Sequence, residues 1–124
     1  MTELLAVALG GAAGSAGRWG LGIALSALLP GLPVGTFVAN VLAGLVIGLV
    51  SGAHALSPLS EPLRLLLTVG LCGGLSTFST FSNETLQMIE GGQLLGAAAN
   101  VVLNVGVCLL AVWAGWRLAG LLAA

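Results

Sequence analysis

Long apolar stretches dominate the chain, and short polar turns separate them. They run from about Leu4 to Leu29, from Val34 to about Ala55, from Leu63 to about Met88, and from Leu94 to about Leu122. Each has the roughly 20 residues that a helix needs to cross the hydrocarbon core of a bilayer. The pattern predicts an all-α integral membrane protein whose four transmembrane helices form a single domain, residues 1–124.

The turns decide which ends of the helices lie together. With four spans, both termini share one side of the membrane with the loop at 54–62, and the turns at 30–33 and 90–93 lie opposite. Arg64 and Arg117 lie near the first side, while the opposite loops contain no lysine or arginine. This is a weak charge bias under the positive-inside rule. A chain that inserts both ways can form an antiparallel pair.

Composition agrees with the membrane assignment. The chain is 58% hydrophobic and 6% charged, with a net charge of −1 and no basic patch, so we expect no nucleic-acid partner. The first apolar run lacks the basic segment of a signal peptide. Cys72 and Cys108 are isolated in apolar surroundings, and we interpret them as small hydrophobic residues.

Glycine spacing predicts close helix packing. Gly10 and Gly14 are four residues apart in the first span, and Gly44, Gly48 and Gly52 continue the same spacing in the second. Small residues at this interval let helix backbones approach where lipid supplies no hydrophobic drive. Each stripe should therefore lie against another helix.

The stretch from Gly70 to Glu84, GLCGGLSTFSTFSNE, interrupts the apolar pattern. It holds six hydroxyl or amide residues around two phenylalanines: Ser76, Thr77, Ser79, Thr80, Ser82 and Asn83. The bilayer core tolerates such backbone only where protein or a cavity surrounds it. We predict a helix break near Gly73–Ser76, beginning at the glycine pair. The alternative is a continuous helix whose hydroxyls bond to the preceding turn.

Other polar residues lie at membrane depth. Arg18 either extends to the nearer interface or draws anions toward a water-filled vestibule. Thr36 and Asn40, four residues apart, share a helix face, where an asparagine either joins helices or donates to an anion. Asn100 and Asn104 form a similar stripe on the fourth span. These donors suit an anion, and so do the positive ring edges of phenylalanines.

Three segments resemble signature motifs of the Fluc/CrcB family of fluoride ion channels: GTFVAN at 35–40, GGLSTFSTFSNE at 73–84, and GGAAGSAGRW at 10–19. The likeness extends over the whole chain in length, span count and motif order. It implies an antiparallel, dual-topology homodimer in the bacterial inner membrane, with two fluoride pores and a central structural Na⁺. The implied function is passive export of fluoride, which relieves its toxicity.

The resemblance also assigns residues. Phe78 and Phe81 match the pore phenylalanines, and Asn40 the pore amide. The remaining matches are Thr36 on the face of Asn40, the polar track Ser79, Thr80, Ser82 and Glu84, and the family arginine Arg18. Backbone oxygens of Gly73 and Ser76 from both subunits would bind the Na⁺. The chain has no tyrosine, so Asn100 or Asn104 is the candidate for the contact that a tyrosine of the fourth helix makes in relatives.

Two other function classes remain to be compared. A small multidrug-type, proton-coupled exporter also has four spans and dual topology, but it needs an acidic residue within the first span. Here Glu3 lies at the start of that span and the charge inside it is Arg18. A purely structural membrane subunit leaves the Ser/Thr run unexplained. No Ser-His-Asp set, metal cluster or phosphate-binding loop indicates an enzyme.

Overall fold

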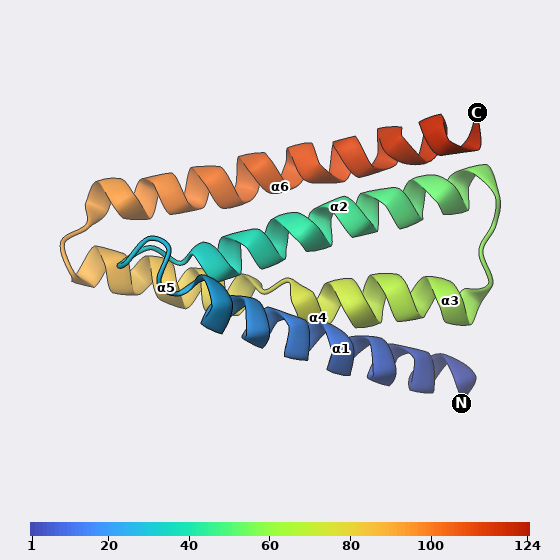
Figure 1. The fold of residues 1–124 in the computed structure, drawn as a ribbon, viewed down its shortest axis with the longest axis horizontal. Coiled ribbons are helices and arrows are strands. Elements are labelled where there is room, and N and C mark those ends of the chain that lie inside the picture. Colours follow the sequence, from blue (N-terminus) through green and yellow to red (C-terminus); the bar gives the residue numbers. More distant parts are fainter.

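The structure, a computed structural model, describes residues 1–124, and all of its regular elements are helices, as predicted. Four rods lie along its long axis (Figure 1). The first is α1 (Thr2–Leu25), the second α2 (Val34–Leu56) and the fourth α6 (Leu94–Ala123). The third consists of α3 (Glu61–Leu65), the π-helical η1 (Leu66–Cys72), α4 (Gly73–Leu75) and α5 (Phe78–Glu90).

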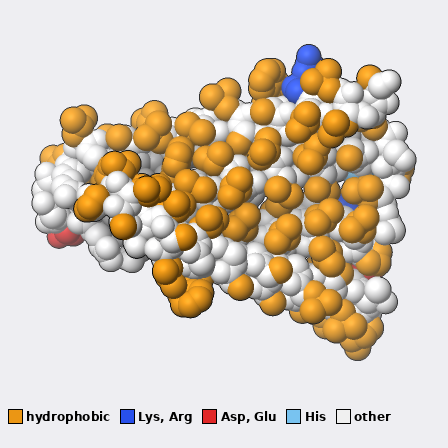
Figure 2. Space-filling view, in the orientation of Figure 1, with side chains coloured by type: hydrophobic (Ala, Val, Ile, Leu, Met, Phe, Trp, Pro, Cys, Tyr) orange, Lys and Arg blue, Asp and Glu red, His pale blue; other side chains and the backbone are white.

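Both termini lie at one end of the molecule, beside the loop that joins α2 to α3, while α5 and α6 are joined at the opposite end (Figure 1). This is the arrangement expected from an even number of membrane passes. Hydrophobic side chains cover most of the face in Figure 2, and the charged side chains visible there lie toward the ends. The surface therefore suits a nonpolar surrounding along its length.

Three of the four predicted spans are long and apolar enough to cross a membrane: Val34–Leu56, Glu61–Glu90 and Leu94–Ala123. The first helix, α1, is 24 residues long but is not among them. Its glycines and Arg18 lower its hydropathy. The chain has only 22 buried residues of 124, and none of its large side chains is fully buried. Most apolar side chains thus face outward, which is expected of a membrane protein.

The first helix ends four residues earlier than predicted. It stops at Leu25 instead of Leu29, and turns follow to residue 32. The residue before a proline is disfavoured in the helical conformation, and here Leu29 precedes Pro30. Gly31 has a φ of +86°, which suits a tight turn.

The predicted break in the third rod is confirmed, but the glycine pair does not form it. Gly73 keeps helical angles, and the chain becomes extended at Ser76 and Thr77. The role of Gly74 is close packing, since a Cβ there would lie 2.6 Å from the carbonyl oxygen of Gly11 in α1. Our placement of the break at the glycines was therefore wrong by about one turn.

Glycine stripes do bring helices together as expected. Gly10 and Gly14 face the backbone of η1 and α4, and an added Cβ at either would overlap main-chain atoms there. Gly44, Gly48 and Gly52 face α6, and a Cβ at Gly48 would overlap the Val112 main chain there. Main chains thus touch directly, and this fixes the spacing of α2 and α6 on one side and of α1 and the third rod on the other.

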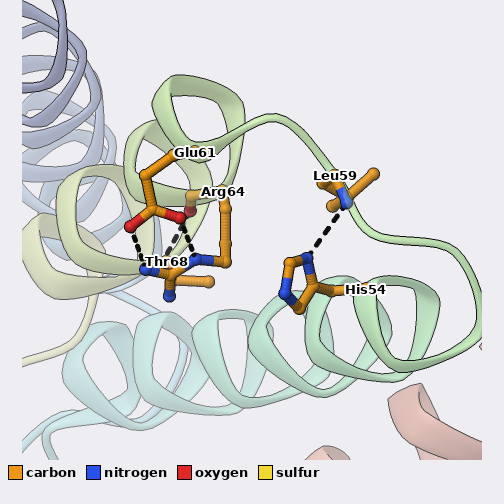
Figure 3. Close-up of polar contacts among 5 residues, drawn as sticks. All are labelled: His54, Leu59, Glu61, Arg64 and Thr68. Atoms are coloured by element: carbon orange, nitrogen blue, oxygen red, sulfur yellow. Dashed lines mark hydrogen bonds and ion pairs between the residues drawn. The ribbon is translucent and has the colours of Figure 1, made fainter.

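Polar contacts hold the loop between α2 and α3 (Figure 3). His54 accepts a hydrogen bond at Nδ1 from the backbone N–H of Leu59, 3.0 Å away. Arg64 pairs with Glu61 one turn earlier, and the Thr68 hydroxyl donates to the Arg64 carbonyl at 2.8 Å. These contacts stabilise the end of the molecule that carries both termini. None of them involves the helix break.

The α2–α6 contact gives a stability test. In Gly48→Ala the new methyl would overlap the Val112 carbonyl oxygen, and overpacking of this kind costs about 1–3 kcal/mol. Gly20→Ala is the control, because nothing lies within 4 Å of its Cβ and alanine favours helix. Thermal unfolding in detergent should show Gly48→Ala clearly less stable than Gly20→Ala. Equal stability would contradict the described packing.

Candidate functional site

A cavity of about 370 Å³ lies at the helix break, between α2, the third rod and α6. Its polar wall comprises Asn40, Thr68, Ser76, Thr77 and Asn104. Phe78, Phe81 and the two cysteines, Cys72 and Cys108, contribute to the apolar wall. No lining residue carries a charge. The cavity thus offers neutral donors and ring edges, which can contact a small anion without binding it strongly.

The two phenylalanines differ sharply in their surroundings. Their ring centroids lie 5.6 Å apart with the planes tilted by 59°. Phe81 is 7% exposed, whereas Phe78 is 78% exposed and extends from the first turn of α5. The structure therefore brings the rings together, but only Phe81 is held by the rest of the chain.

The Asn40 side chain bonds to the backbone at the helix break. Its Oδ1 accepts the backbone N–H of Thr77 at 2.8 Å, and its Nδ2 donates to Asn104 Oδ1 at 3.0 Å. In a continuous helix the Thr77 amide would bond to Gly73, so Asn40 replaces a lost helical hydrogen bond. The asparagine therefore joins three rods, which sequence reasoning had offered as the alternative to anion binding. Its second Nδ2 hydrogen is not used in these bonds, so both roles are compatible.

Thr77 begins α5 as its N-cap. Its hydroxyl oxygen accepts the Thr80 N–H at 3.1 Å, a contact that satisfies one free amide of the first turn. The Thr77 hydroxyl donates to Thr80 Oγ1 at 3.1 Å, while Ser79 and Ser82 are exposed. None of these three predicted track residues lines the cavity within this chain. Thr77 does, and its position directly before the helix could have indicated the cap.

Arg18, on α1, bonds to the backbone just before the helix break. Its Nε donates to the carbonyl oxygen of Gly74 at 3.1 Å, and its side chain is half-buried. The guanidinium does not line the cavity. The contact ties α1 to α4 and satisfies one of the carbonyls that the break releases. Arg18 therefore has a structural partner inside the protein.

Glu84 and Thr36 form a second pair between the third rod and α2. The Thr36 hydroxyl donates to Glu84 Oε1 at 2.8 Å. Glu84 Oε2 is buried without a hydrogen-bond partner. An unpaired buried carboxylate oxygen is unfavourable, and this acid lies two turns along α5 from Thr77. Thr36 thus shares the Asn40 face, as predicted, but contacts Glu84 outside the cavity.

The predicted Na⁺ ligands can be tested against the freed carbonyls. The Thr77 amide, which would bond to Gly73 in a continuous helix, donates to Asn40 instead. The Thr80 amide, which would bond to Ser76, donates to the Thr77 hydroxyl. Gly73 and Ser76 both line the cavity. Hard cations prefer oxygen ligands, so two carbonyls without their helical partners fit such an ion.

The asparagine stripe of α6 is largely engaged in its own contacts. Asn104 Nδ2 donates to the carbonyl oxygen of Asn100 at 2.9 Å and to its Oδ1 at 3.0 Å. Asn100 Nδ2 donates to the Thr85 hydroxyl at 2.9 Å, and Thr85 donates to the Phe81 carbonyl at 2.7 Å. Asn104 lines the cavity, but its Nδ2 already donates to two oxygens of Asn100. Sequence reasoning missed Thr85, although it lies four residues after Phe81.

Comparisons with known proteins agree with the resemblance in the motifs. A family model described as "CrcB-like protein, Camphor Resistance (CrcB)" matches residues 5–116. A protein of Paraburkholderia xenovorans is 49% identical, covering 87% of this chain and 86% of its own length. A protein of Pseudomonas putida is 47% identical, covering 93% and 91%. Both are named fluoride-specific ion channel FluC. These names describe neither an enzyme nor a drug exporter.

Proposed function

This chain belongs to the CrcB-like family, whose curated relatives are named fluoride-specific ion channels, and we propose that it passes fluoride through the membrane beside Phe81. It is a multi-pass membrane protein. One observation carries the proposal beyond the family name. An uncharged cavity at the helix break gathers amide and hydroxyl groups around a buried phenylalanine ring.

Selective passage of fluoride demands weak contacts in series. A small anion holds its water strongly, so the protein must replace that hydration through close donors without trapping the ion. Phe81 would offer its positive ring edge, and Asn40 the amide hydrogen that Asn104 leaves unused. The hydroxyls of Ser79, Thr80 and Ser82, with Glu84 at the end of the track, would complete the path where it leaves the cavity. A larger anion would meet the same narrow gap.

The functional unit we propose is an antiparallel, dual-topology homodimer in the bacterial inner membrane, with all four rods of each subunit spanning it. Two features support it. Phe78 is 78% exposed beside the cavity, where a second copy could cover it and complete a pore. The charge bias between the two ends is small, so both insertions are accessible. Two copies would form two pores, and passive efflux through them would relieve fluoride toxicity.

A structural Na⁺ between the subunits completes the proposal. The carbonyl oxygens of Gly73 and Ser76 from both copies would hold it, four oxygens in all. The positive charge would fix the two breaks against each other and would favour an anion nearby. Backbone oxygens alone are needed, which explains why serine is suitable at position 76.

Phe81→Ile tests the ring directly. It keeps an apolar side chain of similar bulk but removes the aromatic edge, so the fluoride flux should fall about tenfold or more if the ring supplies about 1.4 kcal/mol at the barrier. Phe78→Ile should also lower the fluoride flux. Phe37→Ile is the matched control, since the third phenylalanine of the chain lies outside the cavity wall. Ion-electrode efflux from liposomes measures flux. Unchanged flux in both pore variants would remove the rings from the mechanism.

Dual topology predicts labelling from both sides. Thr2→Cys, made after Cys72→Ala and Cys108→Ala remove the native thiols, places one exposed thiol near the N-terminus. A membrane-impermeant thiol reagent should label comparable fractions in right-side-out and inside-out vesicles. Labelling from one side alone would exclude the antiparallel dimer.

A bound structural cation predicts sodium-dependent stability, because a ligand that binds only the folded state raises the free energy of unfolding. The thermal midpoint of the dimer should be higher in NaCl than in N-methylglucamine chloride of equal ionic strength. Ser76→Ala should keep this difference, since its backbone carbonyl is unchanged. Identical midpoints in the two salts would contradict a sodium site.

A further inference from the structure

A chain of side-chain hydrogen bonds connects two backbone groups of the Phe81 segment. It starts at the Thr77 N–H, ends at the Phe81 carbonyl, and passes in order through Asn40, Asn104, Asn100 and Thr85. Its five donor–acceptor distances lie between 2.7 and 3.0 Å. Every donor lies on the Thr77 side of its acceptor. The five bonds therefore run in a single direction, an arrangement in which each bond polarises the next.

The two backbone ends determine this direction. The Phe81 carbonyl can only accept, so it takes the hydroxyl hydrogen of Thr85. The Thr85 oxygen is then left to accept, and only Nδ2 of Asn100 can supply the hydrogen. At the other end the Thr77 amide can only donate, and it requires Oδ1 of Asn40.

The two ends of the hydrogen-bond chain also determine how the asparagine amides between them are oriented. Asn100 presents Nδ2 to Thr85, so its Oδ1 faces Asn104. Asn104 in turn presents Nδ2 to both Oδ1 and the backbone carbonyl of Asn100, and Oδ1 to Asn40. A reversed Asn40 amide would place oxygen against oxygen at Asn104 and hydrogen against hydrogen at Thr77. Both mismatches would lie in a site of low polarity, where unpaired polar groups are unfavourable.

The orientation matters because Asn40 lines the cavity. With Oδ1 directed at the Thr77 amide and one Nδ2 hydrogen directed at Asn104, the second Nδ2 hydrogen is a free donor. A carbonyl oxygen in its place would repel an anion. We propose that Thr85 and Asn100 are positioning residues which, through Asn104, keep the Asn40 amide oriented as an anion donor; the role of that donor rests on the proposed fluoride function.

Thr85 gives the cleaner test because it lies outside the cavity and its hydroxyl reaches Phe81 only at the backbone carbonyl. Thr85 and Asn100 are 9% and 8% exposed, and neither lines the cavity. Thr85→Val keeps the shape of the side chain but removes the hydroxyl, which leaves the Asn100 amide without its acceptor. Thr85→Ser restores a hydroxyl. An effect of Thr85→Val that Thr85→Ser reverses depends on the hydroxyl, and a change at Asn40 distinguishes transmission through the hydrogen-bond chain from a local change at the Phe81 carbonyl.

Two measurements on the same variants form the experiment. The first is fluoride efflux from liposomes, which should fall about tenfold or more in Thr85→Val and stay near the wild-type value in Thr85→Ser. The second is hydrogen exchange at the side-chain amides of protein labelled with ¹⁵N-asparagine. The chain has only four asparagines, and Asn83 is an exposed internal reference. Hydrogen exchange at the Asn40 side-chain amide should be faster in Thr85→Val than in the wild type, and unchanged in Thr85→Ser.

The outcomes separate the two claims. A folded Thr85→Val protein with wild-type efflux and unchanged Asn40 exchange would overturn the positioning role. Wild-type protein that passes no fluoride, with faster Asn40 exchange in Thr85→Val, would refute the channel function and leave the positioning role supported. Should Thr85→Val not assemble, Asn100→Leu interrupts the chain one bond further on and carries the same expectations for efflux and for Asn40.

Discussion

The backbone at Ser76 and Thr77 must satisfy its polar groups without water, and the rest of the structure depends on how this is done. Asn40 accepts the Thr77 amide, Arg18 donates to the Gly74 carbonyl, and the Thr77 hydroxyl caps α5. Each contact comes from a side chain that is unfavourable in lipid by itself. Their partners lie at the break, so the break accounts for Arg18 of α1 and Asn40 of α2.

Close glycine packing makes these contacts possible. Gly10 and Gly14 let α1 lie against the third rod, which brings Arg18 to Gly74. Gly44 and Gly48 let α2 approach α6 so that Asn40 reaches Asn104. Where helices touch main chain to main chain, short side chains can hydrogen-bond across the interface. The same rigidity supports Phe81, which is buried, while Phe78 extends from the chain.

Sequence reasoning identified the helices and the shared faces, because apolar length and i, i+4 spacing are local properties. Val34 and Leu94 begin their helices as predicted. The break begins at Ser76 and not at Gly73, where the sequence predicted it. A glycine pair can indicate either a break or a close contact, and here Gly74 packs on α1. The partners of Asn40 could not be predicted, since they are set by how three rods pack. Pore roles, the sodium ion and the dimer remain predictions.

Selective anion passage through this cavity is the central claim, and relative permeation tests it most directly. Purified protein in liposomes would be loaded with potassium fluoride or potassium chloride, and efflux would be followed with ion-selective electrodes after a potassium ionophore is added. Neutral donors and ring edges in a narrow gap favour the smaller anion. We expect rapid fluoride efflux with chloride near the rate of protein-free liposomes. Equal efflux of both anions, or none of fluoride, would contradict the account.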